Sequence, residues 1–177
     1  FKIASADITH IPLIKKTASK NLPIFLSTGM ASDEEIDFAI KTIQDTGNEQ
    51  LIIMHCITSY PTKPEDANLD MIQTLHSKFP NYIIGFSDHS DNKLAAITAM
   101  GLGCRVIERH ITLSKKMKGP DHLASDDPEQ FKKYVKMIRN NEKILGNFEK
   151  KKQKEEIEML NISRKGIYYS KDLKKGQ

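Results

Sequence analysis

The chain has 177 residues, of which 38% are hydrophobic and 28% are charged, and these are ordinary proportions for a globular protein. No stretch approaches the run of about 20 apolar residues that a membrane-spanning helix requires. The net charge of +4 comes from residues 148–177, which hold nine Lys or Arg and five Asp or Glu, whereas the first 147 residues hold eighteen of each. The main body is therefore neutral, which excludes the basic footprint of a nucleic-acid-binding protein.

Short β-rich segments alternate with segments of helical spacing along the first 147 residues. The expected strands are residues 1–5, 24–27, 51–56, 82–89 and 104–112. The expected helices are residues 11–20, a segment that begins at Ser32 with a capping box and stops near Gly47, and residues 70–78, 92–102 and 128–145.

A helix between successive strands predicts a parallel sheet, because strand, helix and parallel strand form the usual right-handed crossover. Two architectures fit this order, an open doubly wound sheet and a closed (β/α)₈ barrel. No glycine-rich phosphate loop is present, and every strand ends in polar residues, which favours the barrel. Those strand-end residues are Lys2, Ser5, Ser27, Thr28, His55, Ser87, Asp88, His89, Glu108, Arg109 and His110. A barrel needs eight strands, so we expect residues 1–147 to be its five C-terminal βα units.

His89 and His110 each follow one of two consecutive strands and are joined by a single helix. Two neutral imidazoles on one rim suit a transition metal, with water or an oxygen-rich substrate as the remaining ligands. The alternative is that each histidine caps its own strand by hydrogen bonding.

Small hydroxyls and one ammonium on the same rim suit a phosphate group. They are Lys2, Ser5, Ser27, Thr28 and Ser87. The alternative is that serine and threonine are simply common in βα loops.

Three carboxylates are candidates for acid–base chemistry, namely Asp7, Glu108 and Asp121. The alternative for each of them is an ion pair with Lys118 or Arg109.

The long loop at residues 59–69 is expected to shape a substrate pocket. Tyr60 can form an aromatic wall there, and Thr58 can offer a hydroxyl. Two cysteines do not make a disulfide framework, and we expect a reducing, cytoplasmic location. The Tyr-Tyr run within residues 163–176 is typical of a strand, as if a small β-rich domain began there.

Six motifs in this order resemble the sialic acid synthase family, which includes N-acetylneuraminate, pseudaminic acid and legionaminic acid synthases. They are KIAS, STGMAS, HC-x-TSYPT-x-PEDANL, GFSDH, VIERHITL and KGPDH-x-AS. The resemblance covers essentially the whole chain.

The resemblance implies a (β/α)₈ TIM barrel followed by a small antifreeze-like domain, usually in a domain-swapped homodimer. Residues 1–147 would then supply strands four to eight, with strands one to three absent. Residues 148–177 would be the linker and the truncated start of the antifreeze-like domain. We expect the isolated 177 residues to be inactive, and an open half-barrel to aggregate or to pair with a second copy through its unpaired strand edges.

The resemblance also implies an activity in carbohydrate and polysaccharide biosynthesis. Members condense phosphoenolpyruvate with an N-acylated amino sugar such as N-acetylmannosamine and release phosphate. By resemblance, His89 and His110 hold Mn²⁺ or Mg²⁺, and Tyr60 and Asp121 surround the sugar. The positions matching phosphoenolpyruvate-binding residues are Lys2, Ser5, Ser27, Thr58 and Ser87.

Three alternatives remain open at this point. The parent protein is a synthase of this type, another metal-dependent barrel aldolase or phosphoenolpyruvate-utilising enzyme, or a non-catalytic sugar-phosphate-binding protein. The residues do not identify the amino sugar, which could be N-acetylmannosamine, its 6-phosphate or a diacetamido-trideoxy hexose.

Overall fold

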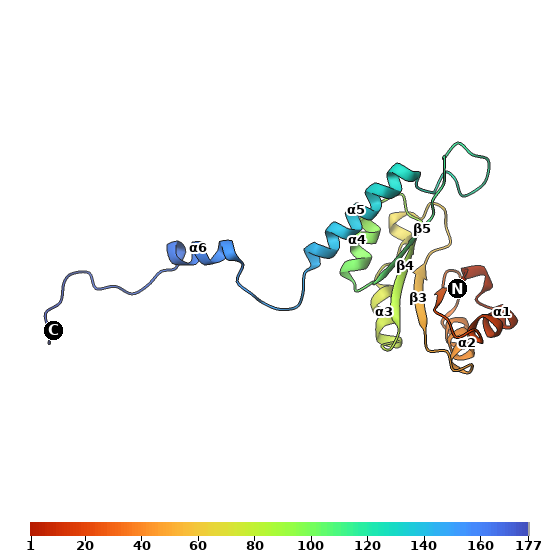
Figure 1. The fold of residues 1–177 in the computed structure, drawn as a ribbon, viewed down its shortest axis with the longest axis horizontal. Coiled ribbons are helices and arrows are strands. Elements are labelled where there is room, and N and C mark those ends of the chain that lie inside the picture. The colour runs from red at the N-terminus through yellow and green to blue at the C-terminus, as the bar shows by residue number, and fades with distance from the viewer. Residues whose placement is uncertain (177) are drawn as a thin grey trace. The chain divides into compact units, whose positions relative to one another are not determined.

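The structure is a computed structural model that describes residues 1–176. The chain divides into two compact units, Phe1–Leu145 and a second unit that begins at Gly146 (Figure 1). The division lies close to the boundary expected at residue 147, and the kind of domain to which the second unit belongs stays a prediction.

The first unit contains five parallel strands, each followed by a helix. The strands are β1 (Lys2–Ile3), β2 (Ile24–Ser27), β3 (Leu51–Cys56), β4 (Ile83–Asp88) and β5 (Val106–Arg109). The helices that follow them are α1 (Ile11–Ala18), α2 (Asp33–Gln44), α3 (Met71–Lys78), α4 (Leu94–Gly101) and α5 (Pro128–Leu145). Short 3₁₀ turns lie at Ser5–Asp7 and Pro64–Asp66. The strands pair in sequence order with every neighbour parallel, so the expected α/β organisation is confirmed.

The sheet is curled rather than flat. Its edge strands are β1 and β5, and in a flat five-stranded sheet they would lie about 19 Å apart, at about 4.8 Å per strand. Yet Nζ of Lys2 on β1 lies 3.5 Å from Oε1 of Glu108 on β5. Only a sheet that curves toward itself brings these two groups together. The unit is therefore a parallel half-barrel, as in part of a TIM barrel.

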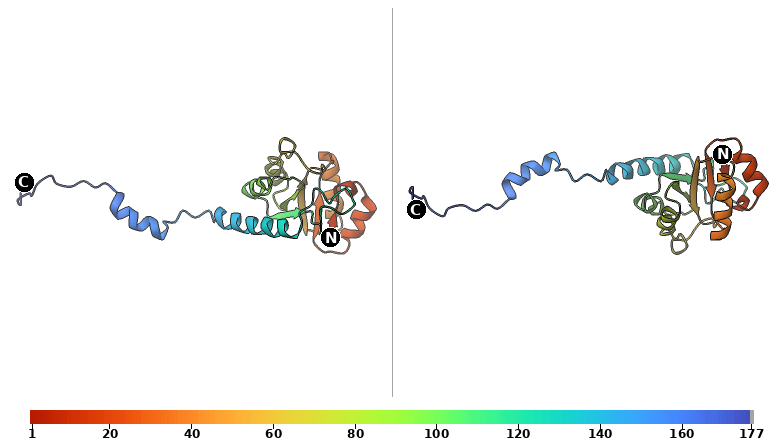
Figure 2. Two further views of the ribbon diagram at one scale, coloured as in Figure 1. Left: turned by 90° about the horizontal axis from the view of Figure 1, so that it is seen from above. Right: turned by 90° about the horizontal axis from the view of Figure 1, so that it is seen from below.

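The hydrophobic core lies between the outer face of the half-barrel and its helices. In Figure 2 the strands lie in the middle of the unit with the helices outside them. Alternate strand residues, such as Leu26, Ile53 and Ile84, point outward and are fully buried together with Ile14 of α1 and Ile72 of α3. This layer holds the strands in place, so the inner face is free to carry polar groups.

Helix α2 begins as its sequence predicts. The hydroxyl of Ser32 accepts a hydrogen bond from the backbone N–H of Glu35, and the Glu35 carboxylate accepts one from the N–H of Ser32. This reciprocal cap satisfies two donors that a helix start otherwise leaves unpaired.

The second unit contains one helix, α6 (Lys154–Ser163). The expectation of a strand around Tyr168 and Tyr169 is wrong for the described chain, because residues 164–176 form no strand. A strand needs a neighbour to accept and donate its backbone hydrogen bonds, and the second unit offers no such partner up to residue 176. Among the residues described, no helix has the length and apolar character needed to cross a membrane.

Replacement of Ile53 by alanine should destabilise the half-barrel. Ile53 is fully buried on the central strand, and removal of such a side chain leaves a cavity that costs about 2–5 kcal/mol. Urea unfolding of the chain should show this loss, whereas Ile144→Ala, at a side chain that is 80% exposed on α5, should change the free energy of unfolding little. Equal effects of the two substitutions would contradict this placement of the core.

The thiol of Cys104 should resist alkylation in the folded chain. Burial raises the pKa of Cys104 to about 12, so at pH 8 it holds less thiolate than a free cysteine, whose pKa is about 8.5. Iodoacetamide labelling at pH 8, read by peptide mass spectrometry, should modify Cys104 slowly in buffer and rapidly in urea. Labelling at the same rate in both would show that the thiol is accessible.

Candidate active site

The ends of β4 and β5 present four polar side chains on the inner face of the half-barrel. Ser87 lies opposite Glu108 in the strand register, and its hydroxyl donates a hydrogen bond of 2.9 Å to Oε1 of Glu108. Side chains two residues apart on a strand share a face. His89 and His110, each two residues further on, therefore extend the same face toward the rim.

His89, His110 and Tyr60 form a cluster of three rings at this rim. The two imidazole centroids lie 5.1 Å apart with their planes nearly perpendicular, at 81°. The ring of Tyr60, from the loop after β3, lies 4.3 Å from that of His89 and 5.4 Å from that of His110. The two histidines lie side by side, as their strand positions predicted, and Tyr60 packs against both rings. The role of Tyr60 as the wall of a substrate pocket stays a prediction.

Hydrogen bonding determines which nitrogen of His89 carries a proton. Nδ1 lies 2.8 Å from the carbonyl oxygen of Ile57, and since a carbonyl only accepts, Nδ1 is the donor. Burial lowers the pKa of His89, outweighing the bond to Ile57, which raises it. The ring is thus favoured in its neutral form, with the lone pair on Nε2. Metal-bound histidines usually have this arrangement, in which the second ring nitrogen donates to a carbonyl.

The chemistry of this donor pair fits a divalent metal with an incomplete protein coordination shell. Two imidazoles from adjoining strand ends supply nitrogen ligands, and Glu108 adds a carboxylate whose contacts are with Ser87 and Lys2. Within residues 1–176 no group of three or more His, Cys, Asp or Glu side chains has the geometry of a metal site. The described residues therefore offer two imidazole ligands and no complete set of protein ligands.

A second group of polar atoms surrounds Gly29, just beyond the end of β2. The N–H of Gly29 donates a 3.1 Å hydrogen bond to Oγ of Ser5. A Cβ on Gly29 would lie 2.4 Å from Oγ1 of Thr58 and 2.8 Å from Oγ of Ser5, so this position requires glycine. The sequence motif STGM contained this residue, but without the strand arrangement nothing identified its role.

Two hydroxyls near Gly29 are buried without a hydrogen-bond partner in the described chain, Oγ of Ser27 and Oγ1 of Thr58. A buried polar group left in this state costs about 1–3 kcal/mol. Both hydroxyls lack an acceptor within the described residues. The hydroxyl of the neighbouring Thr28 has one, because it donates to the carbonyl of Met54 at 3.0 Å.

The only cation expected in the phosphate set, Lys2, is half exposed on the inner face. Its ammonium lies 3.5 Å from Glu108 and donates to its own strand at the carbonyl of Ile3. Lys2 and Ser87 thus share Glu108 as a partner. This pairing differs from the ion pair with Arg109 or Lys118 that was the alternative for Glu108.

The other two candidate carboxylates are less closely tied to the rings. Asp121 is exposed in the loop after β5. The pKa of Tyr60 is raised, first by the burial of Tyr60 and then by the charges of Cys56, Asp121 and Glu108. Asp7, in the turn after Ser5, makes no side-chain hydrogen bond or ion pair within the described residues. Nothing in the structure brings Asp7 to the histidines.

Three strand-end residues point away from the rim, contrary to expectation, namely His55, Asp88 and Arg109. His55 faces the helices, where its Nε2 lies 2.9 Å from the carbonyl of Ala67 and its ring stacks on Phe86. Arg109 also faces outward and pairs with Asp88 and Asp126. The alternation of side chains along each strand accounts for these positions. For Asp88 and Arg109, which directly precede His89 and His110, the same alternation could have identified them from the sequence, whereas His55 also needed the register of β3 against β4.

Comparison with protein families matches residues 1–150 to the NeuB family. An N,N'-diacetyllegionaminic acid synthase of Legionella pneumophila is 40% identical over 99% of the chain and 50% of its own length. An N-acetylneuraminate-9-phosphate synthase of Drosophila melanogaster is 41% identical over 78% of the chain and 37% of its own length. The chain thus spans about half or less of these relatives.

Among solved structures, an N-acetylneuraminic acid (sialic acid) synthetase of Leptospira borgpetersenii superposes with a TM-score of 0.80 at 38% identity. The match covers 93% of this chain and 58% of that one. The half-barrel fold is thus shared with a sialic acid synthetase.

Replacement of Gly29 by alanine should destabilise the chain, because the added methyl group overlaps Thr58 and Ser5. Overpacking of this kind costs about 1–3 kcal/mol, measured as the change in the free energy of urea unfolding. Gly101→Ala is the matched control, since a Cβ there meets no atom within 4 Å and alanine is the better helix former. If Gly29→Ala were as stable as the control, the close approach around Gly29 would be wrong.

Proposed function

The chain belongs to the NeuB family, and from that membership we propose that it forms part of a synthase that joins phosphoenolpyruvate to an N-acylated amino sugar. The product would be a sialic acid or a related sugar acid, with release of phosphate. N-acetylmannosamine, its 6-phosphate and diacetamido-trideoxy hexoses are the candidate sugars.

One observation favours this proposal over the alternative functions. The ring cluster of Tyr60, His89 and His110 shares the inner face with a lysine and with two buried, unpartnered hydroxyls. One rim thus offers donors for an anionic substrate beside nitrogen ligands for a cation. A condensation between an anionic three-carbon acid and a sugar aldehyde needs both.

We propose His89 and His110 as the residues that hold the metal, with Mn²⁺ favoured over Mg²⁺. Imidazole nitrogen suits transition metals, whereas Mg²⁺ is usually held by carboxylates, phosphates and water. A divalent cation bound there would supply Lewis acidity toward the aldehyde oxygen of the sugar. The Nδ1–H bond of His89 to Ile57 leaves the lone pair on Nε2, and a metal there would replace the present 3.3 Å contact of Nε2 with Oγ of Ser87.

Phosphoenolpyruvate would bind through the donors on the same face. Lys2 supplies a positive charge, and Ser27 and Thr58 supply hydroxyl hydrogens that have no other acceptor in the described chain. Ser5 is held by the Gly29 N–H at the edge of this group, and Ser87 by Glu108. These residues would bind and orient the phosphate and carboxylate groups.

In the proposed reaction, carbon 3 of phosphoenolpyruvate bonds to the aldehyde carbon of the sugar. Water then adds at carbon 2, and the bond between carbon 2 and the phosphate oxygen breaks. One proton of that water reaches the new sugar alkoxide and the other leaves with the phosphate, so the water oxygen becomes the keto oxygen at carbon 2. Glu108, whose contacts are with Ser87 and Lys2, would accept a proton on the inner face. Tyr60 and Asp121 would contact the sugar. Asp7 stays a weaker candidate for acid–base chemistry, because no contact connects it with the ring cluster.

The complete synthase would need residues outside these 177. The sheet has two free edges, and a barrel closes with eight strands. We propose that three further strands complete it and that residues 148–177 are the linker and the start of an antifreeze-like domain, in a cytoplasmic, domain-swapped homodimer. Two cysteines without a disulfide are compatible with that compartment.

Alanine at His89 or His110 in the full-length enzyme should abolish metal-dependent phosphate release. Loss of a residue that merely supports a metal ligand costs about 10–100-fold, so loss of the ligand itself should lower the rate by more than that. Release of phosphate from phosphoenolpyruvate is measured with each candidate sugar at saturating Mn²⁺.

His10→Ala is the control, because His10 is exposed at the start of α1 and makes no capping hydrogen bond. Its rate should equal that of the wild type. Unchanged rates in His89→Ala or His110→Ala would refute the metal assignment, and turnover of other keto acids in place of phosphoenolpyruvate would favour an aldolase instead.

A further inference from the structure

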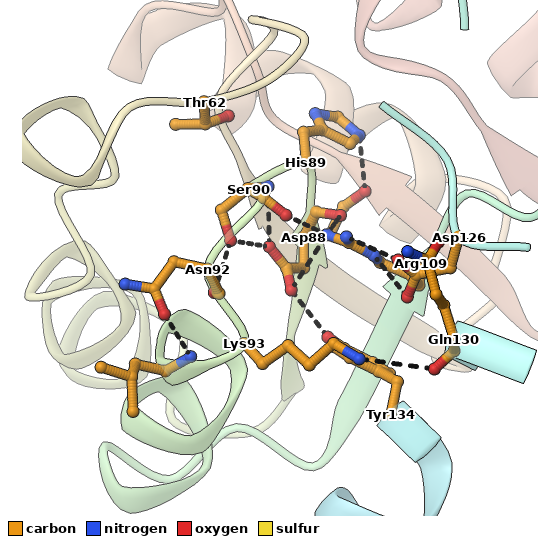
Figure 3. Close-up of polar contacts among 12 residues, drawn as sticks. Thr62, Asp88, His89, Ser90, Asn92, Lys93, Arg109, Asp126, Gln130 and Tyr134 are labelled. Atoms are coloured by element: carbon orange, nitrogen blue, oxygen red, sulfur yellow. Dashed lines mark hydrogen bonds and ion pairs between the residues drawn. The ribbon is translucent and has the colours of Figure 1, made fainter. Parts of the chain in front are cut away.

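Three charged side chains are buried on the face of the strands opposite to the histidines. Asp88 ends β4, Arg109 ends β5, and Asp126 follows the loop after β5. Their side chains are 0%, 4% and 5% exposed. In Figure 3, Asp88 lies between His89 and Tyr134 of α5, with Arg109 and Asp126 beside it. We call Asp88, Arg109 and Asp126 the charge cluster.

Arg109 satisfies its guanidinium group almost entirely within this cluster. Nε and Nη2 donate to the two carboxylate oxygens of Asp126 at 3.3 and 3.1 Å. Nη1 donates to the carbonyl of Asp88 at 3.1 Å and to the carbonyl of Ser90. It also lies 3.4 Å from Oδ2 of Asp88. The planar fork of arginine suits this double contact, which a lysine cannot reproduce.

Asp88 is saturated as well. Its Oδ1 accepts hydrogen bonds from the backbone N–H and the hydroxyl of Ser90 at 2.9 and 2.6 Å. Its Oδ2 accepts a 2.7 Å hydrogen bond from the hydroxyl of Tyr134. The carboxylate therefore connects the end of β4 with α5.

Stability alone does not explain such a cluster. Burial of charges carries a large desolvation cost, and well-packed apolar residues often replace buried ion pairs without loss. What the cluster adds is direction, because several of its hydrogen bonds hold particular backbone atoms, namely the carbonyls of Asp88 and Ser90 and the N–H of Ser90. The atoms held are therefore informative.

Those atoms flank both histidines. The two carbonyls that Arg109 binds belong to Asp88 and Ser90, the residues on either side of His89. On the other strand, the N–H of Asp126 donates to the carbonyl of His110 at 3.0 Å, and the carbonyl of Asp126 accepts from Thr112 at 2.9 Å. The Arg109–Asp126 pair thus joins the peptide of His89 to the peptide of His110.

We propose that Arg109, with Asp88 and Asp126, acts as a positioning residue that holds His89 and His110 at the separation one divalent cation requires. This inference rests on the proposed function, since it assumes that the two imidazoles share a metal. Arg109 and its partners touch neither substrate nor metal. They act through the backbone of the two histidines.

The test measures the affinity of the full-length protein for Mn²⁺ in the absence of substrates. Binding is monitored through the electron paramagnetic resonance signal of the bound ion. Arg109→Lys keeps the positive charge but loses the fork, and should weaken Mn²⁺ binding about 10–100-fold, as loss of outer partners of a metal site does. Arg139→Lys is the matched control, because Arg139 forms an exposed ion pair with Glu142 on α5. It should bind Mn²⁺ like the wild type.

Two kinetic results separate positioning from general damage to the fold. The activity of Arg109→Lys should return as the Mn²⁺ concentration is raised, and the KM for phosphoenolpyruvate at saturating Mn²⁺ should stay at its wild-type value. Wild-type Mn²⁺ affinity in folded Arg109→Lys would overturn the inference and leave the proposed function intact. Absence of Mn²⁺ binding by the wild type would instead overturn the proposed metal site, and the inference with it.

If Arg109→Lys does not fold, Tyr134→Phe decides the question. It removes only the hydrogen bond to Oδ2 of Asp88 and should weaken Mn²⁺ binding in the same direction by a smaller factor. Tyr82→Phe is its control, since Tyr82 makes one hydrogen bond at the surface, to Gln44. Equal Mn²⁺ affinity in Tyr134→Phe and Tyr82→Phe would then overturn the inference.

Discussion

The alternation of side chains at the ends of β4 and β5 is the constraint on which the rest of the site depends. His89 and His110 face the inside of the curled sheet, while Asp88 and Arg109, one residue earlier on each strand, face the helices. A shift of one residue in the register of both strands would turn the two histidines toward the helices and turn Asp88 and Arg109 toward the inner face. The imidazoles would then be buried against α5 and the guanidinium would line the rim. The strand register is therefore as important to the site as the residues themselves.

Buried polar groups on the two faces of the sheet differ in whether they have hydrogen-bond partners within the chain. On the outer face, each buried charge of Asp88 and Arg109 has partners within the chain, so this region is complete without a ligand. On the inner face, the hydroxyls of Ser27 and Thr58 lack partners in the part of the chain that the structure describes. The outer face therefore has its hydrogen bonds satisfied within the chain around Asp88 and Arg109, while the inner face keeps two hydroxyl donors without an acceptor.

Much of the fold could be predicted from the sequence, because it follows from local patterns. Helical spacing, the capping box at Ser32 and the β-rich runs located the strands and helices of the first unit, and the order of elements predicted a parallel sheet. Pairing of His89 with His110 also followed, since both close consecutive strands. Outward orientation of His55, the requirement for Gly29 and the partners of Arg109 could not be predicted, because each depends on contacts between distant residues. The Tyr-Tyr run misled because a strand-like composition does not form a strand without a neighbour.

The central claim is that His89 and His110 form one metal centre on the inner face of a NeuB-family synthase. Anomalous X-ray diffraction at the manganese edge, from crystals of the full-length protein grown with Mn²⁺, tests it most directly. The account predicts one strong peak within bonding distance of Nε2 of His89 and of a ring nitrogen of His110. Manganese bound elsewhere, with none between these two rings, would contradict it.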